Sequence, residues 1–270
     1  MEGMTDRLHI LGNGDSMGVP RVYCECAVCA EARDTGRNRR LRSAAYLDTA
    51  AGGLWIDIGP DWAAQMEALG KRSMPVALLT HAHFDHMAGL PEWADCCRWT
   101  GERGLLYAPQ EVLVQVRDRY PWLERQLTYQ EADNGVRFGE WAIRTKKVCH
   151  GKNGYAYAYR FDKPGFAFVY CPDSINLGPE EKTFLSKLDL LVLGTSYYKE
   201  EFDFHTRSVY DMTEALALAE EVRPRRLYFT HMSHGVDVRQ AYPLPEHVQL
   251  TERGMQIPLR AEAAAARTQP

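Results

Sequence analysis

The sequence predicts one large α/β domain, because short apolar runs alternate with amphipathic segments and no linker divides the chain. The chain has 270 residues, of which 45% are hydrophobic and 25% charged. This balance is typical of globular proteins long enough to bury a sizeable core. No repeat period is present, which argues against a solenoid or a propeller. We therefore expect a single domain over residues 1–260, with the alanine-rich segment 261–270 as a frayed tail.

The individual elements follow from the periodicity of apolar residues. Short apolar runs predict strands, and apolar residues at helical spacing predict helices. We expect strands over residues 8–11, 44–47, 54–58, 75–79, 141–148, 155–161, 166–170, 188–193 and 226–229, and helices over 62–69, 110–122 and 212–222. Polar residues follow several of these strands, where a rigid sheet can aim side chains at one point.

The charge of the chain limits its partners. A net charge of -4 offers no general attraction for nucleic acid or anionic membranes. No N-terminal stretch resembles a signal peptide, and no window reaches the ~20 apolar residues of a membrane span. We therefore expect a cytoplasmic protein that acts on a small molecule, either as a monomer or as a homodimer. One basic stretch comprises Arg37, Arg39, Arg40 and Arg42. We interpret it as a solvated loop, with a substrate-facing role as the alternative.

Three imidazoles and one carboxylate occur within the six residues from His81 to His86. The four side chains, those of His81, His83, Asp85 and His86, are of types that suit zinc, manganese or iron. By simple residue frequencies, such a string arises by chance in roughly one sequence of this composition in two thousand. In an extended loop His81 and His83 project to one side, while Asp85 and His86 can turn towards a neighbouring position. The string therefore predicts ligands for two adjacent ions.

Three further candidate ligands come shortly after predicted strands. They are His150, Asp173 and His231, and they can complete the ligand shells of the two ions. In this order the whole series resembles the metal ligands of the metallo-β-lactamase superfamily, and Asp57 resembles the supporting aspartate of that family. The resemblance covers the chain from about Leu11 to His234. It implies an αββα sandwich, in which two mixed β-sheets face each other and helices cover the outer faces.

The resemblance also implies how the ligands are shared. One divalent ion is held by His81, His83 and His150, the other is held by Asp85, His86 and His231, and Asp173 bridges them.

A cysteine cluster near the N-terminus forms the second candidate metal site. The chain has seven cysteines, and the close spacing of Cys24, Cys26 and Cys29 favours thiolate ligands over disulfides in a reducing compartment. Three thiolates leave one position of a tetrahedral zinc site open, and His234 is our candidate for it. This arrangement resembles the phosphodiesterases that serve carbon–phosphorus lyase pathways of phosphonate breakdown, which hold a structural zinc in this way. We interpret the other cysteines as core or loop thiols: Cys96, Cys97, Cys149 and Cys171.

The same resemblance extends to Gly12-Asn13-Gly14-Asp15, which departs from the usual Gly-Thr-Gly of these enzymes, and to His205. It implies that a histidine ahead of the helix predicted over 212–222 donates a proton to the leaving group. The stretch between His205 and His231 is a few residues longer than in the family.

The resemblance implies a metal-dependent phosphodiesterase whose substrate is a small phosphodiester, such as a cyclic ribose phosphate. Two divalent ions, of manganese, zinc or iron, would lower the pKa of a bridging water and neutralise the phosphoryl oxygens. The bridging hydroxide would then be the nucleophile, with Asp85 and His205 as catalytic side chains.

Other functions share this metal centre and stay open. A ribonuclease that processes tRNA ends is disfavoured by the net charge and by the lack of a basic arm. A lactone hydrolase is compatible with the same residues. A non-catalytic binding protein, like the accessory proteins of pyrroloquinoline-quinone synthesis, would share the cysteine cluster, but those proteins lack the full histidine string.

Overall fold

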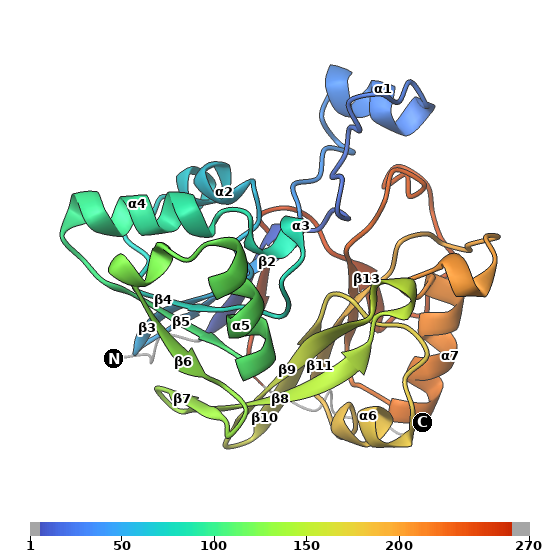
Figure 1. The fold of residues 1–270 in the computed structure, drawn as a ribbon. Coiled ribbons are helices and arrows are strands. Elements are labelled where there is room, and N and C mark those ends of the chain that lie inside the picture. Colours follow the sequence, from blue (N-terminus) through green and yellow to red (C-terminus); the bar gives the residue numbers. More distant parts are fainter. Residues whose placement is uncertain (1–5, 261–270) are drawn as a thin grey trace, which may run out of the picture.

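Two facing β-sheets of seven strands each form the body of the molecule in the computed structural model, which describes residues 6–260 (Figure 1). Their strand orders are β14-β1-β2-β3-β4-β5-β6 and β13-β12-β11-β10-β9-β8-β7. Helices cover the outer face of each sheet. The αββα sandwich predicted from the sequence is therefore confirmed. The predicted tail 261–270 lies outside the described residues.

The first sheet combines antiparallel and parallel pairing. Its strands are β1 (Arg7–Gly12), β2 (Ala44–Thr49), β3 (Gly52–Ile56), β4 (Val76–Leu78), β5 (Gly104–Ala108), β6 (Leu127–Glu131) and β14 (Gln256–Pro258). The strands from β14 to β3 pair antiparallel, and those from β3 to β6 pair parallel. The loop after β4 leads directly into the histidine string.

The second sheet supplies the remaining candidate ligands. Its strands are β7 (Val136–Phe138), β8 (Trp141–Cys149), β9 (Tyr155–Lys163), β10 (Phe166–Cys171), β11 (Leu190–Gly194), β12 (Leu227–Thr230) and β13 (Val248–Leu250). The strands from β7 to β10 pair antiparallel, and those from β10 to β13 pair parallel. His150 and His231 directly follow β8 and β12, and Asp173 is the second residue after β10.

The longer helices bury one face each, as amphipathic helices do on the surface of a sheet. The first sheet carries α2 (Trp62–Leu69), α4 (Leu90–Thr100) and α5 (Gln110–Arg119), and the second carries α6 (Pro179–Phe184) and α7 (Met212–Val222). A capping box between Asp211 and Glu214 fixes the start of α7. Three single turns of 3₁₀-helix are η1 (Leu123–Arg125), η2 (Gly151–Asn153) and η3 (Phe204–Thr206).

Three apolar layers hold the sandwich together. The central layer lies between the sheets and contains large aromatic residues such as Trp141, Phe161 and Phe168. The rings of Phe161 and Phe168 stack with their centroids 4.3 Å apart. Two further layers pack the outer helices onto their sheets. In the described part of the chain, none of the helices has the length and apolar character needed to cross a membrane.

Two local predictions differ from the structure. The helix predicted over 110–122 ends at Arg119, because Pro121 disfavours helical geometry at Tyr120. The segment after His83 was expected to be a loop, but it forms the short helix α3 (Phe84–Met87), which carries Asp85 and His86. Hydrogen bonds between Ile58 and this segment tie it to the end of β3.

An arm projects from the sandwich between β1 and β2 (Figure 1). It carries α1 (Ala27–Asp34) and the three clustered cysteines. At its base, Val19 and Arg40 exchange backbone hydrogen bonds of 3.0 and 2.8 Å. The two ends of the arm are therefore paired with each other at its base.

Candidate metal centre

Seven ligand-type side chains from both sheets meet at one edge of the sandwich, in two groups. The potential ligand atoms within each group lie within 4.8 Å of one another. One group comprises His81, His83 and His150, and the other comprises Asp85, His86, Asp173 and His231. The structure thus brings together every active-site metal ligand expected from the sequence.

Asp173 lies between the two groups. Its Oδ2 is 3.4 Å from Nε2 of His81 and 2.7 Å from Nε2 of His86. Its Oδ1 is 3.1 Å from Nε2 of His231. One carboxylate therefore contacts members of both groups, which is the position needed for a ligand shared by two ions.

Hydrogen bonds to the far side of two imidazoles, those of His150 and His81, determine which nitrogen can bind a metal. Nδ1 of His150 lies 2.7 Å from the backbone oxygen of Ser208, which can only accept, so Nε2 is the free nitrogen. The hydroxyl of Thr80 donates to Asp57, so it accepts from Nδ1 of His81 at 3.0 Å. Nε2 of His81 is therefore also free of a proton. This free nitrogen lies 2.9 Å from Nδ1 of His83.

Asp57 lies directly beneath the centre and is fully buried. Its Oδ2 is 2.8 Å from Nδ1 of His86, and it also accepts hydrogen bonds from the backbone nitrogen and hydroxyl of Thr80. It thereby orients two of the imidazoles, one directly and one through Thr80. A carboxylate behind a histidine in this way is a common support for metal ligands.

Several buried polar atoms of the centre form no hydrogen bond of regular geometry within residues 6–260, although two of the nitrogens lie 2.7 and 3.1 Å from oxygens of Asp173. They are Nε2 of His86, Oδ1 of Asp173 and both ring nitrogens of His231. Leaving such atoms unpaired in a protein interior costs roughly 1–3 kcal/mol each. Because these atoms come from a group of converging nitrogen and oxygen donors, the residues fit divalent cations, which would satisfy them together.

The charge states of His81 and Asp173 agree with this fit. Burial holds the pKa of His81 well below its ordinary value, so this imidazole is neutral. Burial alone would raise the pKa of Asp173, but His231, His150 and His86 together hold it well below its usual range. The centre thus offers a neutral imidazole and an ionised carboxylate, the protonation states in which these groups bind metals. Nearby carboxylates outweigh burial and raise the pKa of His86 and His231, so these two imidazoles must lose a proton when a metal ion binds.

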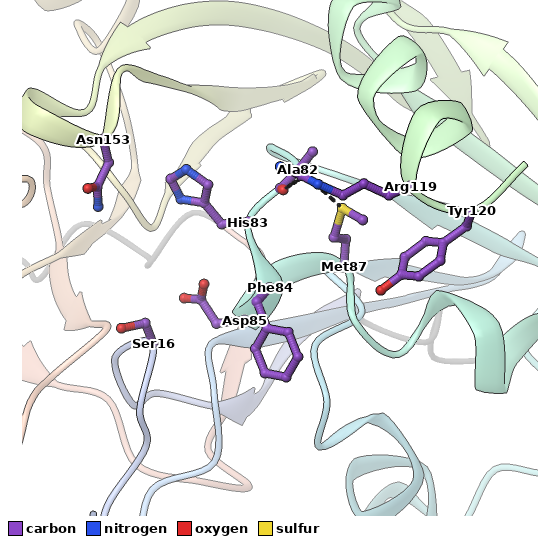
Figure 2. Close-up of a pocket in the computed structure, with 9 residues that line it drawn as sticks. All are labelled: Ser16, Ala82, His83, Phe84, Asp85, Met87, Arg119, Tyr120 and Asn153. Atoms are coloured by element: carbon purple, nitrogen blue, oxygen red, sulfur yellow. Dashed lines mark hydrogen bonds between the residues drawn. The ribbon is translucent and has the colours of Figure 1, made fainter.

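Two cavities open onto the centre. The smaller, of 170 Å³, contacts both groups through His83, Asp85, His150, Asp173 and His231. The larger, of 460 Å³, adjoins it at His83 and Asp85. Figure 2 shows His83, Asp85, Ser16 and Asn153 around a common space, with Arg119, Met87 and Tyr120 on the far side of the Ala82–Phe84 segment. A substrate can therefore reach the ligand groups from the larger cavity.

The cysteine cluster forms a separate site, where the arm meets His234. Nδ1 of His234 lies 3.3 Å from Sγ of Cys24 and 3.5 Å from Sγ of both Cys26 and Cys29. Three sulfur atoms around one imidazole nitrogen correspond to the closed shell of a tetrahedral zinc site. The other four cysteines are free thiols outside this group.

His205 is the one predicted site residue that the structure does not bring to the centre. It lies on η3 with an exposed side chain. From this part of the chain, Ser208 and Val209 line the smaller cavity, and His205 is not among its lining residues. Its role as a proton donor stays a prediction.

Several cavity residues were not predicted from the sequence. Asp15, Arg21, Asn153 and Tyr197 line the smaller cavity, and Arg21 forms an ion pair of 2.5 Å with Asp15. Only Asp15 belonged to a segment that the motif analysis singled out. The others lie on loops whose local sequence carries no signal of a site, and only the fold places them there.

Comparison with known proteins identifies the family. The profile of a family described as a β-lactamase superfamily domain matches residues 54–232, well over half of the chain. The chain belongs to the metallo-β-lactamase superfamily. The matched segment includes every ligand of the two active-site groups. This superfamily member extends beyond the match at both ends, where the cysteine arm and His234 lie.

Two solved structures show which known proteins this superfamily member resembles. A crystal structure described as a new diphosphatase from the PhnP family superposes with a TM-score of 0.81 at 25% identity, covering 95% of this chain and 99% of that one. Zinc-bound PqqB from Methylobacterium extorquens superposes with a TM-score of 0.78 at 18% identity, covering 94% of this chain and 100% of that one. The latter similarity concerns the fold alone.

A curated relative with a different named activity also matches the chain. The octanoyltransferase of Porphyromonas gingivalis is 27% identical over 263 residues, which are 93% of this chain and 51% of that protein. The chain therefore spans about half the length of this relative.

Proposed function

We propose that the chain is a metal-dependent hydrolase of small phosphodiesters. The observation that carries this proposal is the position of Asp173, which contacts both ligand groups among buried nitrogen and oxygen atoms that form no regular hydrogen bond within the described residues. The similarity to a PhnP-family diphosphatase at 25% identity supports a phosphorus-containing substrate.

The side chains have distinct roles in this proposal. His81, His83 and His150 would hold one divalent ion, Asp85, His86 and His231 would hold a second, and Asp173 would contact both. Bound divalent ions supply a nucleophile from water at neutral pH and neutralise charge on phosphoryl oxygens. Asp57 and Thr80 keep the imidazoles in the tautomers that bind metal. Ser208 does the same for His150 through its backbone oxygen.

The larger cavity favours a small substrate with one bulky substituent. Its volume of 460 Å³ lies within the range of small-molecule sites. Phe84, Met87 and Tyr120 give it apolar walls, and Arg119 donates to the backbone oxygen of Ala82 at its edge. A phosphodiester positioned at the metal centre can therefore place one ester substituent in this cavity.

A hydrolysis panel tests the proposal. Purified protein is reconstituted separately with manganese, zinc and iron and assayed on bis(p-nitrophenyl) phosphate, cyclic phosphates, diphosphate diesters, p-nitrophenyl phosphate and lactones. We expect diester cleavage to exceed monoester and lactone cleavage, and Asp173→Ala to abolish it. Faster lactone opening would contradict the phosphodiester assignment, and no turnover on any substrate would favour a binding protein.

Acyl-ester hydrolysis is a second candidate, favoured by the similarity to an octanoyltransferase. Because the match spans about half of that protein, its name does not show which half carries the activity. Including an octanoyl thioester in the panel separates the two candidates. Thioester cleavage faster than diester cleavage would favour the second.

A further inference from the structure

A cavity of 240 Å³ lies apart from the metal centre and is rich in arginine. Its lining residues are Asn13, Gly36, Arg37, Arg39, Arg40, Val238, Thr251, Glu252 and Arg253. None of them lines either cavity of the metal centre. Four arginines therefore line one cavity together with a single acidic residue, Glu252.

Arg40 is the buried member of this group, with 3% of its surface exposed. Its terminal nitrogens donate to the backbone oxygens of Ser233 and Val236 and to the side chain of Asn38. Its Nε is buried and has no partner in the part of the chain that the structure describes. Burial lowers the pKa of Arg40 to about 10, so the group remains charged at neutral pH.

Asn13 is the second buried polar residue of the cavity, also 3% exposed. Its amide nitrogen donates to the backbone oxygen of Thr251, while its Oδ1 has no partner. Arg40 and Asn13 thus each keep one polar atom unpaired within the described residues, next to the cavity that the two residues line but shielded from it.

Three more arginines line the cavity without forming an ion pair in the described part of the chain. The side chains of Arg37, Arg39 and Arg253 are exposed, and within residues 6–260 they form no hydrogen bond or ion pair. By contrast, the neighbouring Arg42 pairs with Asp61 at 3.1 Å. Bringing like charges together around a cavity is unfavourable unless an anion accompanies them.

We propose that this cavity binds the phosphate or diphosphate group of a small molecule. Guanidinium groups match phosphate oxygens with paired, charge-assisted hydrogen bonds, and several of them can share one polyanion. The buried Arg40 supplies a rigid charge at the inner wall, and the exposed arginines can close over the ligand. The basic stretch interpreted from the sequence as a solvated loop is, in this proposal, one wall of a binding site.

The backbone of Asn13, Asp15 and Met232 connects the arginine cavity with the cavity of the metal centre. Met232 donates from its backbone nitrogen to the oxygen of Asn13, and Asp15 donates from its nitrogen to the oxygen of Met232. Asn13 lines the arginine cavity, whereas Asp15 and His231 line the cavity of the metal centre. The two proposed sites therefore share this segment of backbone as part of their walls.

Calorimetric titration with inorganic phosphate and with pyrophosphate tests the proposal. The titrations use the Asp173→Ala variant, so that anions bound at a loaded metal centre do not contribute. We expect binding that Arg39→Ala or Arg253→Ala weakens by roughly ten-fold or more, because each removes charge-assisted hydrogen bonds. Arg137→Ala, which removes an exposed arginine from β7, is the matched control and should leave binding unchanged. Thermal unfolding of each variant checks that the fold is retained.

The outcomes are distinct. Tighter binding of pyrophosphate than of phosphate would assign the ligand to compounds with a diphosphate group, and the reverse would assign it to phosphate or a monoester. Equal binding by the arginine variants and the control would overturn the proposal. So would binding that the wild-type protein shows and that the Asp173→Ala variant, with all its arginines intact, does not show. Because none of these measurements uses hydrolysis, failure here leaves the proposed activity untouched.

Discussion

The metal centre and the cysteine cluster are three residues apart in the chain at His231 and His234, yet they are built differently. The centre is buried between loops of both sheets, and its ligands are oriented by Asp57, Thr80 and the backbone of Ser208. The cysteine cluster is partly exposed and draws three of its four groups from a single arm.

This difference indicates different tasks. Converging ligands with a shared carboxylate and an adjoining cavity leave room for a substrate, as in catalytic sites. Three sulfur atoms and one nitrogen close a shell around a single ion and leave no position for a substrate. We therefore expect changes in the centre to alter turnover and changes in the cluster to alter stability. Four variants test this expectation, in order of falling effect on turnover.

The largest effect is expected from Asp173→Ala. Removing the carboxylate that contacts both groups should abolish hydrolysis and lower the metal content of both positions. Elemental analysis and steady-state assays check this result, with His81→Ala as the companion variant. Turnover near the wild-type rate in either variant would rule out the assignment of the centre.

His205→Ala tests whether a side chain outside the cavities of the metal centre takes part in hydrolysis. If His205 protonates the leaving group, cleavage of alkyl or cyclic diesters should slow ~100-fold while nitrophenyl diesters slow far less, because nitrophenolate leaves without a proton. Metal content should stay normal. Equal losses on both substrates, or none, would remove the acid role and leave the metal centre intact.

Asp57→Asn should produce an intermediate effect through His86. Asparagine keeps the shape and tolerates the left-handed backbone found here, with φ of 63°, but it lacks the carboxylate that fixes the imidazole. We expect metal affinity or activity to fall by about 10- to 100-fold. Titration with manganese measures the affinity, and an unchanged value would show that Asp57 does not position His86.

Cys26→Ser should change turnover least and stability most. We expect loss of a zinc ion that otherwise resists mild chelation, and a lower thermal midpoint, by roughly 2–4 °C for each kcal/mol lost. The fully loaded wild type should contain about three ions per chain, two at the centre and one at the cluster. Cys149→Ser removes an exposed thiol outside the cluster and serves as the control.

The result of that comparison also tests His234. A His234→Ala variant that keeps the chelation-resistant zinc would show that the fourth ligand lies elsewhere. A turnover loss in Cys26→Ser as large as that in Asp173→Ala would show that the two regions do not divide the tasks as proposed.

Local patterns in the sequence predicted most of the strands, the helices α2, α5 and α7, and the ligand types. The histidine string lies within six residues, and the other ligands follow apolar strands, so periodicity alone places them at strand ends. The resemblance carried by these residues implied the αββα sandwich, which the structure confirms. The C-terminal end of α5 and the existence of α3 were missed, because Pro121 and the hydrogen bonds of Ile58 act on segments that periodicity alone assigns differently. The helices α1, α4 and α6 and the strands β5, β6, β7, β13 and β14 were not predicted either.

Only the tertiary structure decided which groups meet. The contacts of Asp173 with both groups, and the hydrogen bond from His150 to Ser208, join residues from different strands and loops. The same holds for the arginine cavity, where Arg253 lies beside Arg39 across more than two hundred residues of chain. Such contacts depend on how the sheets twist and pack, since burial of apolar side chains, and not local sequence, brings distant loops to one edge.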